Sequence, residues 1–201
     1  MNFEDAVTAR RSVRAFTDDP VPDDVIERAV RLAVTAPAPH HSQPWRFVLL
    51  EDESRKRGFA EAMGRAWADD LRGDGLDEAR IEAITARSLN LLTATPLLVV
   101  CCADNSRSHN YPDERRRLAE WSLFAHSIGA ALQVFMTSLA ADGIASCWIS
   151  APVFCRDTVR AELGLPDALE PHALALVGRS SPSYRPRPRP AQDPKTFIIR
   201  A

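Results

Sequence analysis

Apolar residues in the first third of the chain recur with the period of a helix. A first helix is predicted directly after Asn2, a residue type that caps helices. Glu4 and Asp5 lie in the first turn of this helix. A second helix is predicted to begin at Pro22 and to end before Pro37. Its expected buried stripe consists of Val25, Ile26, Ala29, Val30 and Ala33.

Short apolar runs rich in β-branched and aromatic residues predict four strands. The predicted strands are Trp45–Leu50, Leu97–Cys102, Ser146–Ser150 and Ala173–Val177. Helical periods between them predict helices at Ser54–Leu71, Asp77–Thr93, Pro112–Ala140 and Val153–Leu163. The strands are few and too irregularly spaced for repeated βαβ units, so the pattern indicates an α+β fold with one small sheet.

The longest predicted helix is mostly apolar through its second half, and we expect it at the centre of the fold. Its apolar positions recur at three- and four-residue steps: Leu118, Trp121, Ala125, Ile128, Leu132, Phe135, Met136 and Leu139. Trp121 and Phe124 are expected to be core residues rather than residues that stack on a ligand.

Length and composition favour a single domain over residues 1–201, since 201 residues with 45% apolar side chains suffice for one core. No apolar stretch is expected to reach the roughly 18 residues of a membrane span. The start MNFEDAVTAR is acidic where a signal peptide would be basic and then apolar. We therefore expect a cytoplasmic protein without a membrane partner.

Four cysteines fall in apolar runs, which predicts reduced core thiols. They are Cys101, Cys102, Cys147 and Cys155. No His, Cys and carboxylate set has metal-binding spacing, so no metal is expected. Nucleotide-binding glycine motifs and a Ser/His/Asp arrangement are also missing from the sequence. This composition suits an enzyme whose cofactor performs the difficult chemistry.

Residues 10–14 form an arginine cluster, Arg10-Arg11-Ser12-Val13-Arg14. Guanidinium groups match phosphate oxygens with forked donors, so the cluster is a candidate phosphate site. The alternative is an ordinary solvated basic face. A second basic segment, Arg185 to Arg189, occurs in a chain whose net charge is only −2. Two isolated basic patches favour a local anion over nucleic acid, which would leave a broader positive surface.

Residues 36–45 form a second notable segment, Ala-Pro-Ala-Pro-His-His-Ser-Gln-Pro-Trp, which we name the platform. Three prolines stiffen the backbone around two imidazoles and an amide. Such a segment suits a flat heterocycle that needs directed hydrogen bonds. An arginine cluster and a platform together predict a bound nucleotide-like cofactor.

The segment from Ser180 to Pro194 is biased toward proline and arginine. It lacks apolar residues for a core of its own, and its prolines favour extended backbone. We name residues 179–201 the arm and expect it to lie across something else, with a partner subunit as the candidate.

Three motifs together resemble the FMN-dependent nitroreductase superfamily: RRSVR, the platform continued as SQPWRF, and GIASCWIS after the long helix. Within that superfamily, TAPAPHHSQPWRFV, AWADDLRGDGL and HNYPDERRRLAE look most like the C-terminal domain of the actinobacterial coenzyme F-420 γ-glutamyl ligase. The resemblance implies a small, mostly antiparallel sheet flanked by helices. It also implies a homodimer with FMN between subunits and each arm crossing to its neighbour, and a ligase domain as a further partner if the chain is a fragment.

The resemblance assigns FMN-binding roles to several positions. The arginine cluster would hold the phosphate through Arg10, Ser12 and Arg14, with Arg11 and Val13 beside them, and the arm would add Arg187 and Arg189. The platform would place Ala38, Pro39 and His41 against the ribityl chain and ring. The other ring edge would be lined by Trp148, Ile149 and Ser150.

Many superfamily members carry Asn where His41 stands, and His40 precedes it. A neutral imidazole supplies one donor and one acceptor, and near pH 6.5 it also becomes a cation. Both histidines are therefore candidate proton donors in catalysis, and a histidine merely packed in a loop is the alternative for His41.

Asp70 lies where the related domain touches its deazaflavin substrate, and an exposed helix acid is its alternative role. His109 and Tyr111 precede the long helix. They are expected in an ordinary loop rather than in a substrate pocket.

The leading prediction is an FMN-dependent oxidoreductase that reduces a dehydro precursor of coenzyme F-420. Such an enzyme acts mainly by holding two flat rings about 3 to 3.5 Å apart. A general NAD(P)H-dependent nitro or quinone reductase is the first alternative. A non-catalytic module that holds a flavin or deazaflavin is the second.

Overall fold

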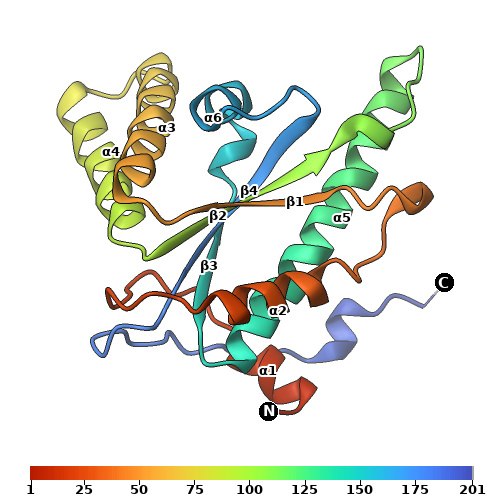
Figure 1. The fold of residues 1–201 in the computed structure, drawn as a ribbon, viewed down its shortest axis with the longest axis horizontal. Helices are drawn as coiled ribbons and strands as arrows, with labels where there is room; N and C mark the ends of the chain where they lie inside the picture. Colours follow the sequence, from red (N-terminus) through yellow and green to blue (C-terminus); the bar gives the residue numbers. More distant parts are fainter. Residues whose placement is uncertain (201) are drawn as a thin grey trace.

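The computed structural model describes residues 1–200 and places a four-stranded sheet between two groups of helices (Figure 1). The strands are β1 (Trp45–Leu50), β2 (Leu97–Asp104), β3 (Ala145–Ile149) and β4 (Leu169–Gly178). Their order is β1-β2-β4-β3, and every neighbouring pair is antiparallel. The predicted α+β class with one small antiparallel sheet is confirmed.

Both faces of the sheet are buried. Successive residues of a strand point to opposite sides of the sheet, so each strand contributes side chains to two cores. On β2, Leu97, Val99 and Cys101 belong to one core cluster. Leu98, Val100 and Cys102 belong to the other. This two-sided burial explains why the sequence of β2 is a continuous apolar run rather than an alternating one.

One face of the sheet is covered by α2 (Asp23–Ala33) and the long α5 (Glu114–Ala141) (Figure 1). Phe135 of α5 is completely buried and packs with Phe47 of β1, the ring centroids 5.4 Å apart. Truncating a fully buried Phe to Ala typically costs about 3–5 kcal/mol. The expectation that the second half of the long helix is central is therefore correct.

The opposite face is covered by α3 (Glu53–Gly73), α4 (Glu78–Thr93) and α6 (Arg156–Leu163) (Figure 1). Lys56 of α3 is almost fully buried, and its ammonium donates to the carbonyl oxygens of Thr95 (2.9 Å) and Pro96 (3.2 Å). Those carbonyls follow the end of α4, so the lysine ties α3 to the segment leading into β2.

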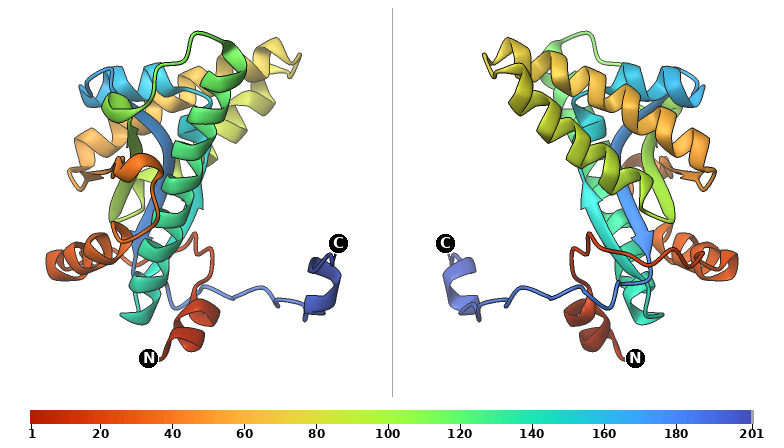
Figure 2. Two further views of the ribbon diagram at one scale, coloured as in Figure 1. Left: turned by 90° about the vertical axis from the view of Figure 1, so that its right-hand side faces the viewer. Right: turned by 90° about the vertical axis from the view of Figure 1, so that its left-hand side faces the viewer.

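The N-terminal helix α1 (Phe3–Ala9) is capped as predicted, since the Asn2 side chain accepts from the Asp5 amide at 2.9 Å. At the other terminus the arm leaves β4 beside Phe16, which forms a bridge with Ser180. Figure 2 shows the arm running away from the sheet and helices to the short 3₁₀ helix η4 (Pro194–Phe197). Phe197 and Ile199 at its end are 70% and 94% exposed, so the arm buries little against its own chain.

Three sequence expectations need correction. Leu118 is 59% exposed, because the residues of α5 that enter the core begin only at Phe124. The helix expected from Val153 begins only at Arg156, because a short 3₁₀ helix, η3 (Ala151–Val153), with Pro152 in its first turn precedes it. An 18-residue window of α5 has a mean hydropathy of 1.4 and meets the length and composition of a membrane span; half of it is buried within the fold.

Candidate functional site

The arginine cluster is fixed to the start of β3. Ser12 forms a parallel bridge with Ser146, and the Val13 amide donates to the Ser146 carbonyl at 3.0 Å. Val13 is buried, whereas Ser12 and Arg14 are exposed. A packed valine thus anchors a short extended segment whose polar residues remain available to a ligand.

The arm joins this cluster within the same chain. The Arg189 guanidinium donates to the Arg10 carbonyl at 3.0 Å. Partial burial and the adjacent charges of Arg189 and Arg11 lower the pKa of Arg10. The arm thus reaches the cluster of its own chain through Arg189, and its crossing to a partner subunit stays a prediction. Like charges held together in this way would be stabilised by a bound anion.

A groove of about 1060 Å³ opens beside the arginine cluster. Arg14 lines it, as do Ile149 at the end of β3 and Trp67 and Asp70 on α3. Its remaining walls are mainly apolar and come from α3, α4 and the η3 region: Met63, Leu71, Ile84, Leu91, Ala151 and Phe154. Five segments of the chain therefore bring a cation, a carboxylate and apolar walls to one concave site.

The residues expected at the ring edge divide between the two faces of β3. Ile149 lies in the groove and packs with the core under α3 and α6. Trp148 lies on the other face, 3.6 Å from the position of a Cβ on Gly129 of α5. Ser150 is exposed directly after the strand. Of the predicted substrate contacts, Asp70 is exposed and lines the groove, so the structure places it beside the site.

The platform lies around the 3₁₀ helix η1 (Pro39–His41), directly before β1. His40, His41 and Gln43 all have φ near +50°, in the left-handed region that side chains rarely adopt. Each such residue costs of order 1 kcal/mol or more, and such conformations concentrate at functional sites. Ser42 between them is buried, and its hydroxyl has no partner among the described residues.

The platform and the arginine cluster lie at opposite edges of the sheet, because β1 and β3 are its two outer strands. They also lie toward opposite ends of it. Trp45 pairs with Ala103 at the end of β2, whereas Ser146 pairs with Val177 near the end of the antiparallel β4. Within residues 1–200, the groove contains no platform residue, so the two segments do not form one site within a single chain.

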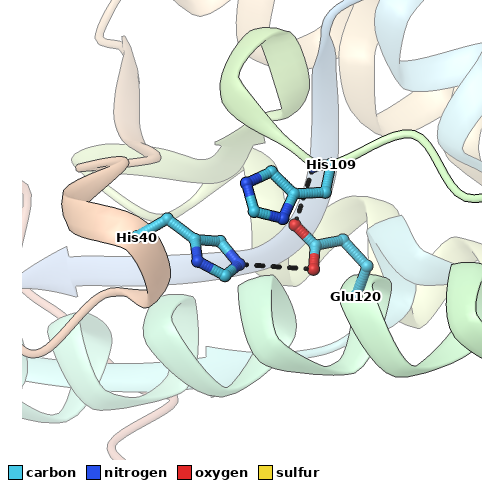
Figure 3. A group of neighbouring side chains, drawn as sticks. All are labelled: His40, His109 and Glu120. Atoms are coloured by element: carbon cyan, nitrogen blue, oxygen red, sulfur yellow. Dashed lines mark hydrogen bonds and ion pairs between the residues drawn. The ribbon is translucent and has the colours of Figure 1, made fainter.

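The two platform histidines have different surroundings. His40 Nε2 lies 3.5 Å from Oε2 of Glu120, and its ring stacks on His109 with centroids 3.9 Å apart (Figure 3). The His41 ring is exposed, and among residues 1–200 it makes no side-chain hydrogen bond or ion pair. Sequence reasoning placed His109 in an ordinary loop and did not single out Glu120. His40, His109 and Glu120 are separated in the sequence, so no local motif indicates that these three side chains meet.

The cysteines are not candidate nucleophiles. Burial raises the pKa of Cys102 to about 12 and also raises that of Cys101 and of Cys155. Burial likewise raises the pKa of Cys147, although Arg14 and Arg10 nearby oppose the effect. A thiol with a raised pKa carries little thiolate near neutral pH. The thiols thus occupy the apolar positions that the sequence predicted.

Trp121 and Glu170 form part of a second polar cluster, near the start of β4. The Trp121 indole donates to Glu170 Oε1 at 2.5 Å, and Arg156 pairs with the same oxygen at 3.0 Å. Trp121 is half-buried and Phe124 fully buried, so both serve the packing of α5 as predicted.

The sheet order, the long central helix and the flanking helices define a nitroreductase-like fold. The sequence profile described as "Nitroreductase family" matches residues 7–179, and the chain therefore belongs to the nitroreductase family. This family makes it an oxidoreductase and confirms the superfamily resemblance, without resolving the narrower likeness to the F-420 ligase domain.

Solved structures with the same fold include flavoproteins. A BluB-like flavoprotein from Clostridium difficile 630 superposes with a TM-score of 0.80 at 21% identity, covering 100% of this chain and 99% of that one. A nitroreductase with bound FMN from Bacteroides fragilis gives a TM-score of 0.75 at 20% identity, covering 100% of both chains. At these identities the likeness establishes the fold.

Curated relatives match over a shorter length. The iodotyrosine deiodinase of Hydra vulgaris is 35% identical over 83 residues, which cover 35% of this chain and 30% of the relative. The chain therefore spans less than a third of the length of this relative.

Proposed function

We propose that the protein is an FMN-dependent oxidoreductase that works as a homodimer, with each FMN held by the arginine cluster of one copy and the platform of the other. The observation that carries the proposal is the separation of these two segments at opposite edges of one sheet. In a symmetric dimer, the platform of each copy would lie against the arginine cluster of the other, which gives two equivalent sites.

The residues of the groove fit FMN in size and charge. Its volume of about 1060 Å³ lies at the upper end of small-molecule sites, which are about 300–1,000 Å³. Arg10, Ser12 and Arg14 would hold the phosphate dianion. Arg11, Val13, Arg187 and Arg189 are proposed to complete that end of the site. Burial and the neighbouring charges of Arg189 and Arg11 lower the pKa of Arg10, and a bound phosphate would offset both effects.

The platform is proposed to hold the ring end. Ala38, Pro39 and His41 would lie against FMN from the second copy, and Ile149 and Ser150 would border the ring from the first. Trp148 was also expected at the ring edge, but it lies on the other face of β3 against Gly129 and so does not line the groove. Bound FMN supplies a hydride donor and acceptor. The work of the protein is then to fix the orientation of the substrate and to exclude water, with apolar walls such as Met63 and Leu91.

A proton must accompany hydride transfer to a carbon-nitrogen or carbon-carbon double bond. The His40 ring contacts Glu120 and His109, whereas the His41 side chain makes no hydrogen bond or ion pair among residues 1–200. We propose His41 as the residue that holds and delivers this proton at a ring nitrogen, and His40 as the residue that fixes the loop.

The proposed substrate is a dehydro precursor of coenzyme F-420. Three observations support it: the groove is larger than a single small substrate needs, Trp67 offers an aromatic wall, and Asp70 offers a carboxylate at the groove. The segment that carries Trp67 and Asp70 is also one of the three that resemble the F-420 ligase domain.

The test is anaerobic. FMN-loaded protein is reduced, dehydro-coenzyme F-420 is added, and flavin absorbance is followed. The proposal expects stoichiometric reoxidation with formation of the saturated coenzyme. Failure to reoxidise, together with rapid reduction of nitroaromatics or quinones by NADPH, would reject the F-420 assignment and leave the general reductase.

Reductive dehalogenation is a second candidate, favoured by the 35% identity to the Hydra deiodinase over 83 residues. Adding iodotyrosine to the same reduced protein decides between them. Release of iodide with reoxidation of the flavin would support this candidate over the deazaflavin substrate. A flavin that no substrate reoxidises would instead indicate the non-catalytic binding module.

A further inference from the structure

Three side chains from distant parts of the sequence meet on the outer side of α5. His40 comes from η1, His109 from the loop between η2 (Asn105–Arg107) and α5, and Glu120 from α5 itself (Figure 3). One potential ligand atom of each lies within 4.8 Å of those of the other two. Both histidines are exposed, and Glu120 is only 5% exposed.

The Glu120 carboxylate is buried, and its charge faces a histidine rather than a lysine or arginine. Its Oε1 accepts one hydrogen bond, from the His109 backbone amide at 2.8 Å. Its Oε2 faces His40 Nε2 at 3.5 Å, which is longer than an ordinary N–H···O bond. Among residues 1–200, no lysine or arginine pairs with it. A buried carboxylate is costly unless it is paired with a cation or coordinates a metal.

From this geometry we propose that His40, His109 and Glu120 bind one divalent transition-metal ion of the Zn²⁺ type. Two imidazoles and one carboxylate are a common zinc donor set, and bonds of about 2.0–2.2 Å at tetrahedral angles separate donors by about 3.4 Å. The His40–Glu120 separation of 3.5 Å matches that value without movement. A fourth position remains open on the exposed side.

Binding requires one rearrangement. The His40 and His109 rings are stacked with an interplanar angle of 23°, and two nearly parallel rings cannot both direct a nitrogen at one ion. His109 is the ring that turns, because the His40 ring already directs Nε2 at Glu120 Oε2 at 3.5 Å.

The ion would fasten the platform to the first half of α5. His40 is adjacent to His41, so a bound metal would also limit the motion of the residue proposed to deliver a proton. The site itself rests on the three side chains alone and does not depend on the proposed function.

The experiment is titration calorimetry of chelator-treated, full-length chain that carries no polyhistidine tag. ZnCl₂ is expected to bind saturably at one ion per chain. The H109A and E120Q variants should each weaken this binding about 100-fold or more, since even partners of metal ligands contribute 10–100-fold. H109A changes an exposed loop residue, so its result stands if E120Q fails to fold.

The matched control is H126A, which removes an exposed histidine of α5 outside the cluster. It should bind Zn²⁺ like the unchanged chain. An absence of saturable binding, or equal binding by H109A and the unchanged chain, would overturn the proposal. So would an equal loss in H126A, because the ion would then bind surface histidines in general.

Discussion

Arg14 is the residue where the arginine cluster meets the groove, because it belongs to both. Arg14→Ala removes one charge-assisted contact to a phosphate, worth about 1.5–3 kcal/mol. FMN affinity should therefore fall by about 10- to 150-fold. Fluorescence titration of flavin-free protein measures this change, with the exposed Arg31→Ala on α2 as the control. Equal affinities of the two variants would refute the phosphate role.

Lys56 provides a test of the fold that is independent of cofactor binding. Lys56→Met keeps the length of the apolar stem but removes the ammonium that satisfies the Thr95 and Pro96 carbonyls. Leaving buried acceptors unpaired should lower the free energy of unfolding by about 3 kcal/mol. Urea denaturation measures it, and Arg57→Met, at the exposed neighbouring position, should change little. Unaltered stability of the Lys56 variant would contradict the tie between α3 and the segment leading into β2.

Individual residues show how far the candidate site follows from the sequence. Arg14, Ile149 and Asp70 were predicted from local motifs, and the structure brings all three to one groove. Their roles toward a ligand remain predictions. Glu120 carried no local signal, since on its helix it has the appearance of an ordinary charged residue. Only the packing of the loop containing His109 against η1 and α5 reveals its partners.

At the scale of elements, β1 was predicted with its exact bounds, because Pro44 and the acidic turn after Leu50 limit it on both sides. β4 was predicted too short, from Ala173 to Val177, whereas it runs from Leu169 to Gly178. Its first residues, Leu169 to His172, include charged and titratable side chains that obscure the apolar pattern. Their partners, such as Asn105 and Trp121, come from distant segments, so no local pattern could reveal them.

His172 on β4 makes stability depend on pH. Burial lowers its pKa, the Glu170 charge opposes this, and Arg156 adds to it. Because an unfolded histidine has a pKa of about 6.5, protons favour the unfolded chain below that value. The free energy of unfolding should fall as pH drops from about 6.5 to 5, by up to about 1.4 kcal/mol per pH unit.

The measurement is a series of urea denaturations between pH 7.5 and 5. His172→Gln should flatten the dependence, whereas His126→Gln, an exposed histidine, should leave it unchanged. Hydrogen bonds lower the pKa values of the carboxyl groups of Asp52, Asp104 and Asp113, so these groups change stability only at more acidic pH. An unaltered slope in the His172 variant would contradict the assignment.

The whole molecule has surfaces that a single chain leaves uncovered. The arm ends in exposed Phe197, Ile198 and Ile199, and Leu118 and Leu123 are exposed on the first half of α5. Exposed apolar residues on an extended arm and on a helix suit an interface between two copies. The arm was predicted from its composition, but its contact with Arg10 of its own chain was not, since composition does not specify which neighbour an extended segment meets.

The proposal at this scale is that one chain holds the phosphate and another supplies the platform. It makes a specific prediction for mixed dimers of two defective chains, Arg14→Ala and His41→Ala. In such a dimer, the intact cluster of one chain faces the intact platform of the other, so one of the two sites is restored. If instead each site lay within one chain, every site in the mixture would carry a substitution.

The decisive measurement is the FMN-binding capacity of the two variants separately and after unfolding and refolding them together. Each variant alone should lack high-affinity FMN sites. The refolded mixture should regain them at about one site in four, since random pairing makes half of the dimers mixed. No recovery of high-affinity FMN in a mixture that refolds to native-like dimers would contradict the shared site.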